Sequence, residues 1–160
     1  MDCTSCHNVH DGKPADALLT KATSETCRAC HAEVFAKFQL NERHRLEEGI
    51  LECTSCHNPH KPESRMNLAG FKQAECLKCH TDKQGPFVYE HGSVEVEGCV
   101  ACHEPHGTVN RHQLKLPSVG MLCYSCHAVV PHNNYTSVDS DCIQCHTYIH
   151  GSNLDFTLRN

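Results

Sequence analysis

The octapeptide CTSCHNPH at residues 53–60 holds the pattern that decides the fold, Cys-x-x-Cys-His, followed by a further histidine. The five-residue pattern occurs seven times in the 160 residues, and its copies use all 14 cysteines. Two thiols at this spacing form thioethers with the vinyl groups of a haem, and the adjacent histidine can reach the iron. The sequence therefore predicts seven covalently bound c-type haems.

The motifs supply two sets of candidate residues. The cofactor-binding residues are Cys3, Cys6, Cys27, Cys30, Cys53, Cys56, Cys76, Cys79, Cys99, Cys102, Cys123, Cys126, Cys142 and Cys145. The proximal iron ligands are His7, His31, His57, His80, His103, His127 and His146.

Structural zinc and disulfide bonds are the alternatives for such a cysteine-rich chain. Neither requires a histidine directly after the second cysteine of each pair. With histidine near a tenth of the composition, seven such placements by chance have a probability on the order of 10⁻⁷. Covalent haem is therefore the preferred interpretation.

The composition is poor for a conventional core, because the 39% hydrophobic fraction includes the 14 cysteines and there is no tryptophan. Porphyrins would supply the missing apolar mass, at roughly 23 residues per haem. We therefore expect the apoprotein not to fold, as small metallodomains do not fold without their metal.

The formal charge of −5 becomes roughly −19 with reduced haems and −12 with oxidised ones once the propionates are counted. Such a chain is expected to avoid nucleic acid and to bind basic or electrically mixed redox partners. It has no apolar stretch of 18 residues and no secretory leader. Because haem is attached in this way outside the cytoplasm, the sequence suggests a periplasmic protein, of which residues 1–160 are a mature or excised piece.

The motifs alternate between two kinds. Some carry a further histidine three residues on, and the others are followed later by a solitary histidine. This alternation predicts one heptahaem domain over 1–160, with haem-pair repeats at about 24–69, 70–115 and 116–160 after a partial unit at 1–23.

Eight histidines lie outside the motifs, and seven haems need at most seven distal ligands. This supply predicts bis-histidine ligation and disfavours methionine, although any one of these histidines could instead be a surface residue. His112 breaks the repeat and is interpreted as a surface residue. The predicted distal ligands are His10, His44, His60, His91, His106, His132 and His150.

The simplest ligation scheme is exchange within neighbouring haem pairs. It leaves the Cys3 haem without a distal ligand and His10 without a haem. Residues before Met1, another molecule or His112 could resolve this anomaly. The scheme assigns His60 to the Cys27 haem, His44 to Cys53, His106 to Cys76, His91 to Cys99, His150 to Cys123 and His132 to Cys142.

The predicted fold class is a multihaem cytochrome c that is mostly coil with short α-helices, negligible β-structure and an extended array of haems. Helical periodicity predicts a helix over 32–48 and shorter ones at 70–79 and 118–126, the last capped by Ser118. Pro59 and Pro105 favour turns after the preceding proximal histidines.

Several stretches resemble the MtrA/DmsE family of periplasmic multihaem cytochromes, relatives of the pentahaem NrfB type. These are CHNPH at 56–60, the span over 76–110, CYSCHAVVPH at 123–132 and CIQCHTYIHGSN at 142–153. The resemblance covers essentially the whole chain and implies a bis-histidine haem wire that is mostly coil. Family members usually carry ten motifs, and this sequence resembles the last seven.

The resemblance implies an electron-transfer protein rather than an enzyme. In the metal-reducing branch, the wire carries electrons between periplasmic or inner-membrane cytochrome donors and an outer-membrane or extracellular multihaem acceptor, inside a porin-type β-barrel sheath. A soluble periplasmic shuttle to a terminal reductase is the alternative. A multihaem reductase is a further alternative and would need an open iron, for which only the haem at Cys3–His7 is a candidate.

Overall fold

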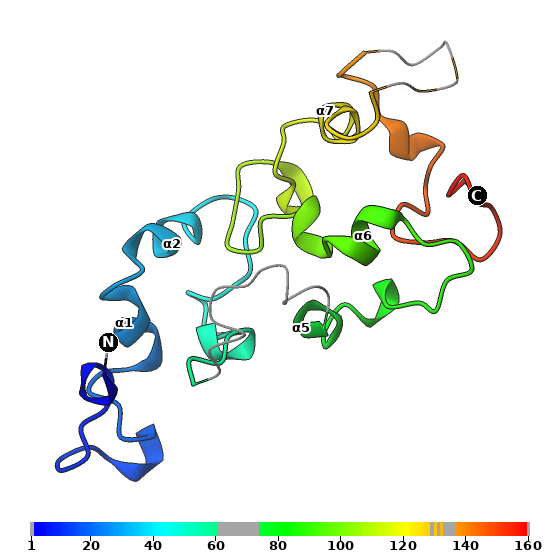
Figure 1. The fold of residues 1–160 in the computed structure, drawn as a ribbon. Coiled ribbons are helices and arrows are strands. Elements are labelled where there is room, and N and C mark those ends of the chain that lie inside the picture. Colours follow the sequence, from blue (N-terminus) through cyan, green and yellow to red (C-terminus); the bar gives the residue numbers. More distant parts are fainter. Residues whose placement is uncertain (1, 61–73, 129, 131, 133–136, 160) are drawn as a thin grey trace.

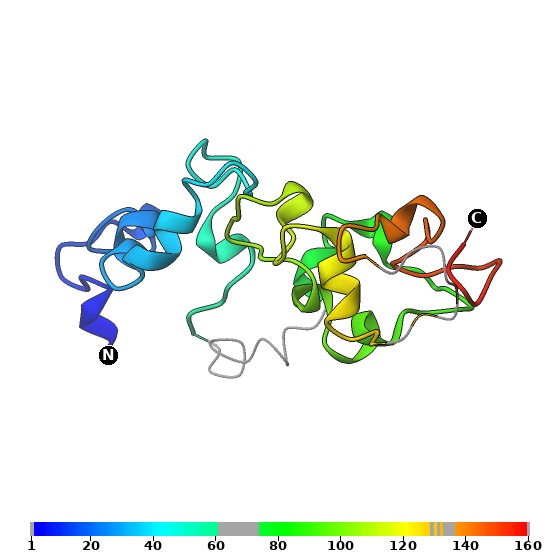
Figure 2. The same cartoon turned by 90° about the horizontal axis from the view of Figure 1, so that it is seen from above.

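The computed structural model describes residues 2–60, 74–128, 130, 132 and 137–159. The chain is elongated, with its two termini at opposite ends (Figures 1 and 2). This shape agrees with the extended array predicted from the repeats.

Short helices joined by coil make up the described chain, which contains no strand longer than an isolated bridge. The predicted fold class, mostly coil with short helices, is therefore confirmed. The α-helices are α1 (Thr23–Arg28), α2 (Ala32–Lys37), α5 (Ala74–Leu77), α6 (Gly92–Val96) and α7 (Val119–Tyr124). The 3₁₀ turns are Cys3–Ser5, Pro14–Asp16, Cys53–Ser55, Thr81–Lys83, Cys99–Ala101, Arg111–Gln113 and Cys142–Gln144.

Every motif closes one helical turn. The backbone N–H of the motif histidine donates to the carbonyl of the first cysteine over 2.8–3.0 Å in all seven copies. Residues separated by three or four positions lie on one face of such a turn, so both thiols and the imidazole face one side. The local fold therefore presents the three groups that a c-type haem needs.

The two kinds of motif differ in local structure. The motifs at Cys3, Cys53, Cys99 and Cys142 begin with a 3₁₀ turn, and we call them turn motifs. The motifs at Cys27, Cys76 and Cys123 start within α1, α5 and α7, and we call them helix motifs. The alternation seen in the sequence is thus an alternation of backbone conformation.

The helix predictions succeed in part. Helix α7 begins after Ser118, whose side chain accepts from the backbone N–H of Met121, as predicted. Helix α5 lies inside the predicted 70–79, of which 70–73 fall outside the described residues. Turns follow at Pro59 and Pro105, as predicted.

The predicted helix over 32–48 is wrong beyond Lys37. Phe38 caps α2, and Glu42 then forms an antiparallel bridge with Thr108 through two backbone hydrogen bonds of 3.1 and 2.9 Å. A backbone committed to that bridge cannot continue as a helix, so the tertiary contact overrides the local periodicity.

The apolar core is small. Among the described residues, the buried apolar side chains are Phe38 and Leu158. The accessible surface is 11513 Å² for a chain of 17.9 kDa, against about 8,000 Å² expected for a folded protein of that mass. The polypeptide alone thus leaves far more surface in water than a self-sufficient domain does, as the composition predicts.

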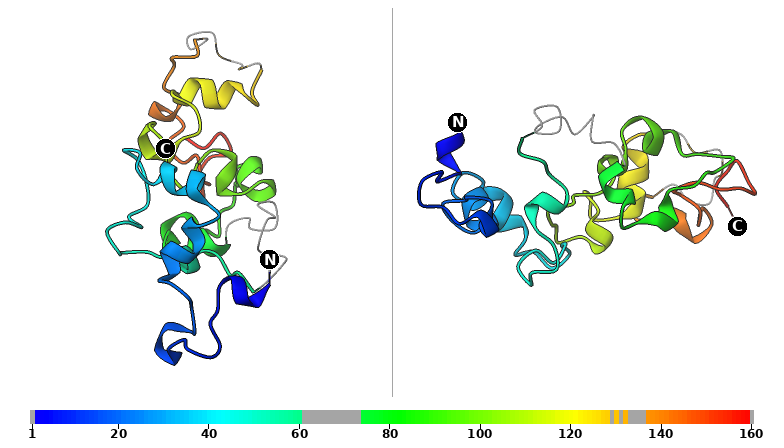
Figure 3. Two further views of the ribbon diagram at one scale, coloured as in Figure 1. Left: turned by 90° about the vertical axis from the view of Figure 1, so that its left-hand side faces the viewer. Right: turned by 90° about the horizontal axis from the view of Figure 1, so that it is seen from below.

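Two long-range bridges, Glu42–Thr108 and Tyr89–Ser152, position the later motifs. Gly107, at φ +143°, lies so close to α2 that a Cβ there would stand 2.2 Å from the Lys37 carbonyl oxygen. Tyr89 and Ser152 exchange backbone hydrogen bonds of 2.8 Å, which join the segment after α5 to the C-terminal segment. Both meetings of distant segments can be followed in Figure 3.

Candidate haem-binding sites

Twelve of the 15 histidines form six ring pairs, five with planes inclined by 14–23° and one, His44–His80, with planes inclined by 73°. Their ring centroids lie 5.8–6.3 Å apart. A metal ion bound about 2 Å from one nitrogen of each ring would separate the ring centres by about 6 Å. The pairs are His7–His60, His44–His80, His57–His106, His91–His127, His103–His150 and His132–His146.

This donor arrangement fits haem rather than zinc. Zinc in structural sites takes four ligands from cysteine and histidine. Within the described ranges, no group of three or more histidine, cysteine or acidic residues could hold a metal ion on its own. None of the 14 cysteines is in a disulfide bond. Two axial nitrogens with two nearby thiols are the protein's share of a c-type haem site.

The pairs correct the predicted exchange between neighbouring haems. His60 faces His7, not His31, and His106 faces His57, not His80. The assignments of His44, His91 and His150 are wrong as well, because these rings face His80, His127 and His103. The assignment of His132 to the Cys142 motif agrees with the structure, where it faces His146.

The observed pairs follow a longer-range rule. The histidine that follows a turn motif faces the proximal histidine of the preceding turn motif, as in His60–His7 and His106–His57. The solitary histidine after a helix motif faces the next helix motif, as in His44–His80. His132, which follows the last helix motif, instead faces His146 of the final turn motif. Some histidines therefore pair with an earlier repeat unit and others with a later one, so that consecutive units are joined in both directions.

The unpaired proximal histidine is His31, in the first helix motif. Its side chain is exposed, and in the described part of the chain no second histidine ring faces it. His10 is also exposed and faces no other histidine ring there. The anomaly predicted for the Cys3 haem thus belongs to the Cys27 haem, because His60 lies opposite His7.

Backbone carbonyls orient the histidine rings. The Nδ1 atoms of His7, His44 and His103 lie 2.8–2.9 Å from the carbonyl oxygens of Ala17, Pro105 and His112. A Nδ1–H that donates to a carbonyl leaves Nε2 unprotonated and free to bind a metal. His146 makes the same contact with the Thr157 carbonyl.

Three of the accepting carbonyls, those of Ala17, His112 and Thr157, lie in return loops that the sequence analysis missed. Each loop passes back over its turn motif and contains residues at positive φ, such as Ala17 at 52°, His112 at 58° and Leu158 at 60°. His112 therefore acts through its backbone, and its side chain is exposed as predicted. The corresponding region after His57 falls outside the described residues.

Consecutive motifs meet through their first cysteines. Burial, the charge of Cys27 and a hydrogen bond to it raise the pKa of Cys53 to about 11. The hydrogen bond to Cys76 lowers the pKa of Cys99 to about 6, and that of Cys76 rises correspondingly. The thiols in hydrogen-bond contact are Cys27 with Cys53, Cys76 with Cys99, and Cys123 with Cys142.

The second cysteines supply the intervening links. The pKa of Cys56 is raised by burial and then by the charges of Glu75 and Cys79. The pKa of Cys102 is raised by burial and then by the charge of Cys126. From the Cys27 motif to the Cys142 motif, each attachment site therefore adjoins the next one along the chain.

Comparison with known proteins agrees with this geometry. The family model for the doubled CXXCH motif matches residues 1–36, 44–85 and 91–131. The chain is 38% identical, over 94% of its length, to the multiheme cytochrome MtrA of Shewanella baltica. The chain belongs to the family of multihaem c-type cytochromes with doubled CXXCH motifs.

A second relative of this cytochrome is the high-molecular-weight cytochrome c of Nitratidesulfovibrio vulgaris, 27% identical over 96% of the chain. The chain spans 50% of the length of the MtrA relative and 28% of the second. The three matched motif pairs indicate about six covalent c-type haems.

Burial changes the pKa of three of the paired histidines. It lowers the pKa of His91, His106 and His150, and nearby positive charge adds to the effect at His91 and His150. At His106 the charge of Glu104 opposes the effect of burial without cancelling it. A depressed pKa keeps these imidazoles neutral at neutral pH, which is the form that binds a metal. No helix among the described residues is long and apolar enough to cross a membrane.

Proposed function

We propose that the chain is a wire of seven covalently attached haems that relays electrons along its length. The observation that carries the proposal is the set of histidine pairs at 5.8–6.3 Å, five of which link alternate motifs and one of which links the last two motifs. The contacts between consecutive cysteines support the same interpretation, because they keep successive haem edges close.

In this proposal the 14 motif cysteines attach the haems and the motif histidines are the proximal ligands. The distal ligands are His60, His44, His106, His91, His150 and His132, acting on the haems that their ring pairs define. His10 remains a candidate ligand for an iron outside these pairs. The 160 residues form one heptahaem domain, with the seventh haem at Cys142–His146 beyond the matched motif pairs.

Bis-histidine ligation sets the chemistry that the haems supply, reversible one-electron transfer at low potential. The chain's own residues hold each iron on both sides and leave no exchangeable position at the six paired sites. His60 opposite His7 also removes the reason for an open haem at Cys3–His7. The open iron that the reductase alternative needs would then belong to the Cys27 haem, at His31, and not to the Cys3 haem.

The test of this proposal is haem stoichiometry combined with ligation. Intact-mass measurement of the purified holoprotein should give seven haems, and low-temperature EPR should give six as low-spin bis-histidine centres. Fewer than six low-spin haems would contradict the assigned pairs. A mass that is lower by one haem, together with an unmodified Cys142 peptide, would contradict the assignment of the seventh haem and leave the other six assignments unaffected.

The physiological route is a further part of the proposal. It runs from a periplasmic or inner-membrane donor to an outer-membrane or extracellular multihaem acceptor, with the wire held in a porin-type barrel. The support is the similarity to MtrA, of which the chain spans half. Extraction of the cytochrome with an outer-membrane porin in detergent supports the sheathed wire, and its release alone with the periplasmic fraction supports the soluble shuttle.

A further inference from the structure

One distal histidine has a carboxylate partner. His106 Nδ1 lies 3.3 Å from a carboxylate oxygen of Glu104, and each side chain is about a quarter exposed, at 26% and 25%. His106 faces His57, the proximal histidine of the Cys53 motif. Five other paired histidines direct Nδ1 to a backbone carbonyl or to a serine hydroxyl.

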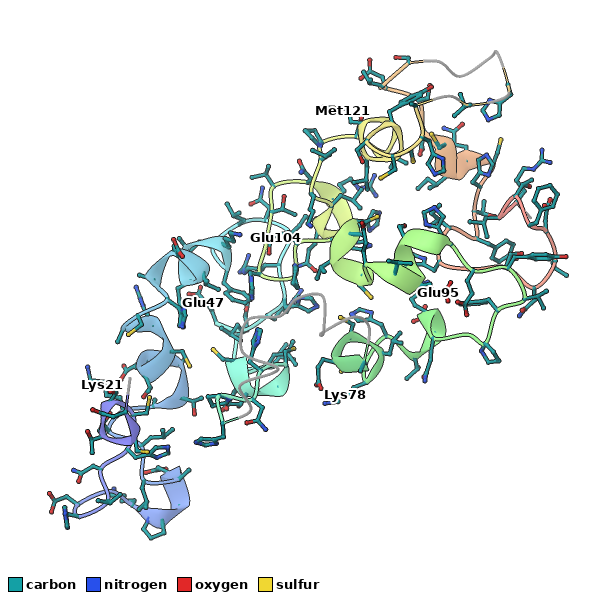
Figure 4. The ribbon with its side chains drawn as sticks, in the orientation of Figure 1. Lys21, Glu47, Lys78, Glu95, Glu104 and Met121 are labelled. Atoms are coloured by element: carbon teal, nitrogen blue, oxygen red, sulfur yellow. The ribbon has the colours of Figure 1, made fainter. Side chains whose placement is uncertain are left out.

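The structure holds this carboxylate in place from two sides. Lys37 Nζ donates to its other oxygen over 2.8 Å, and the Glu104 backbone N–H donates to the Gln113 carbonyl over 2.8 Å. Gly107 lets the turn pack directly against the end of α2, where Lys37 lies. Glu104 lies near the middle of the elongated molecule, between its two ends (Figure 4).

The repeat supplies an internal comparison. The residue after the proximal histidine is asparagine in the two earlier turn motifs that carry the extra histidine, and glutamate in the third. Asn58 Oδ1 accepts from the backbone N–H of His60 over 3.0 Å, and Asn8 does the same for His10 over 3.2 Å. Glu104 keeps this role for His106 at 3.4 Å and adds a negative charge beside the ring.

We propose that Glu104 is a positioning residue that orients His106 and lowers the reduction potential of the Cys53 haem relative to the Cys3 haem. The inference rests on the proposed function, because it takes His57 and His106 as the two ligands of one iron.

The physical reason is the charge of the ligand. A carboxylate that accepts the Nδ1 hydrogen of a ligating imidazole raises the basicity of that imidazole and favours the more positive ferric iron. The Cys3 haem receives His60, whose motif carries a neutral amide at the equivalent position. Two haems with the same pair of axial ligands thus differ by one carboxylate.

Glu104→Gln tests the inference, because glutamine keeps the size of the side chain and its oxygen acceptor but loses the charge. At a fixed ambient potential near the midpoint, the ferrous-to-ferric ratio of the Cys53 haem should rise about tenfold, the low end of outer-shell effects. For a one-electron couple, that is a shift of about 59 mV. The g-values of one low-spin EPR signal should change with it.

Asp82→Asn is the matched control. Asp82 is also paired with a lysine, Lys83 at 2.8 Å, and it acts on the ligand His150 through its charge. We expect this variant to move a potential less than Glu104→Gln does and to leave all g-values unchanged. Equal shifts in both variants, without a change in g-values, would overturn the hydrogen-bond account in favour of general electrostatics.

The reciprocal variant Asn58→Glu places the carboxylate beside His60 and should lower the potential of the Cys3 haem. His106→Ala separates the two proposals. If His106→Ala converts one haem to high spin while Glu104→Gln changes no potential, the inference about Glu104 is wrong and the ligand assignment stands. If His106→Ala leaves every haem low-spin, the ligand assignment itself fails.

Discussion

Replacing His60 by alanine should convert the Cys3 haem, and no other, from low-spin to high-spin. His60 and His7 have ring centroids 5.8 Å apart and planes inclined by 18°, so His60 is the ring that completes this site. The expected change is the loss of one of the six low-spin haems, roughly 17% of the integrated low-spin EPR intensity. A water molecule or an empty position would replace the imidazole.

The affected haem can be identified with a second background. In a Cys3→Ala/Cys6→Ala variant, which attaches no haem at the first motif, adding His60→Ala should create no new high-spin signal. His44→Ala is the control, because His44 faces His80 and should produce the high-spin signal in both backgrounds. A new high-spin signal from His60→Ala in the Cys3/Cys6 background would refute the pairing, since His60 would then serve another haem.

Three further predictions concern the segments that hold the ligands. Gly107→Ala should lower the free energy of unfolding by about 3 kcal/mol, because of backbone strain at φ +143° and the close main-chain contact. This corresponds to a fall in Tm of roughly 6–12 °C. Gly92 has open space around it, so Gly92→Ala should leave Tm unchanged. His112→Gly should leave all haem spectra intact, because the contacts of His112 are made by its backbone, whose carbonyl lies against His103 Nδ1 and whose N–H donates to Glu42. It should also relieve about 1 kcal/mol of left-handed strain in thermal unfolding; loss of a low-spin haem would show instead that its side chain is a ligand. Hydrogen bonds from Thr157 hold the pKa of Asp155 below its usual value, so its stabilisation is complete at neutral pH and is lost as the pH falls below about 4. The difference in Tm between pH 7 and pH 3 should therefore be smaller in Asp155→Asn than in the unaltered protein, and an equal difference would contradict the prediction.

The local features of this cytochrome could be predicted because they depend on short spacings. The motif Cys53–His57 closes its turn with groups that it contains itself, and the same is true of the six other motifs. The cap at Ser118 and the turn at Pro105 are equally local. Their outcome follows from residues within four positions of one another.

The partner of each distal histidine could not be predicted, because it depends on contacts between distant segments. His106 reaches His57 because the turn at 104–108 docks on the end of α2 through the close approach of Gly107, and on the segment after α2 through the Glu42–Thr108 bridge. Neither contact has a periodic signature in the sequence. The alternation of turn motifs and helix motifs was visible, however, and like pairing with like is the signal that could have pointed to the observed rule.

The return loops were missed for a related reason. Residues such as Ala17, His112 and Leu158 adopt positive φ, a conformation that their side chains do not favour. Propensity gives no hint of such positions, since the loop conformation is imposed by the hydrogen bond from the proximal histidine. His112 does not fit the histidine repeat, because it contacts the proximal histidine His103 through its backbone carbonyl and not through its side chain.

The most direct test of the haem wire is low-temperature EPR of the air-oxidised holoprotein, with spin integration against the haem content. The ring pairs predict six low-spin bis-histidine haems, and a seventh, on His31, that is high-spin in the 160-residue chain and becomes low-spin when imidazole is added. Two or more high-spin haems, or bound zinc in place of haem iron, would contradict the account.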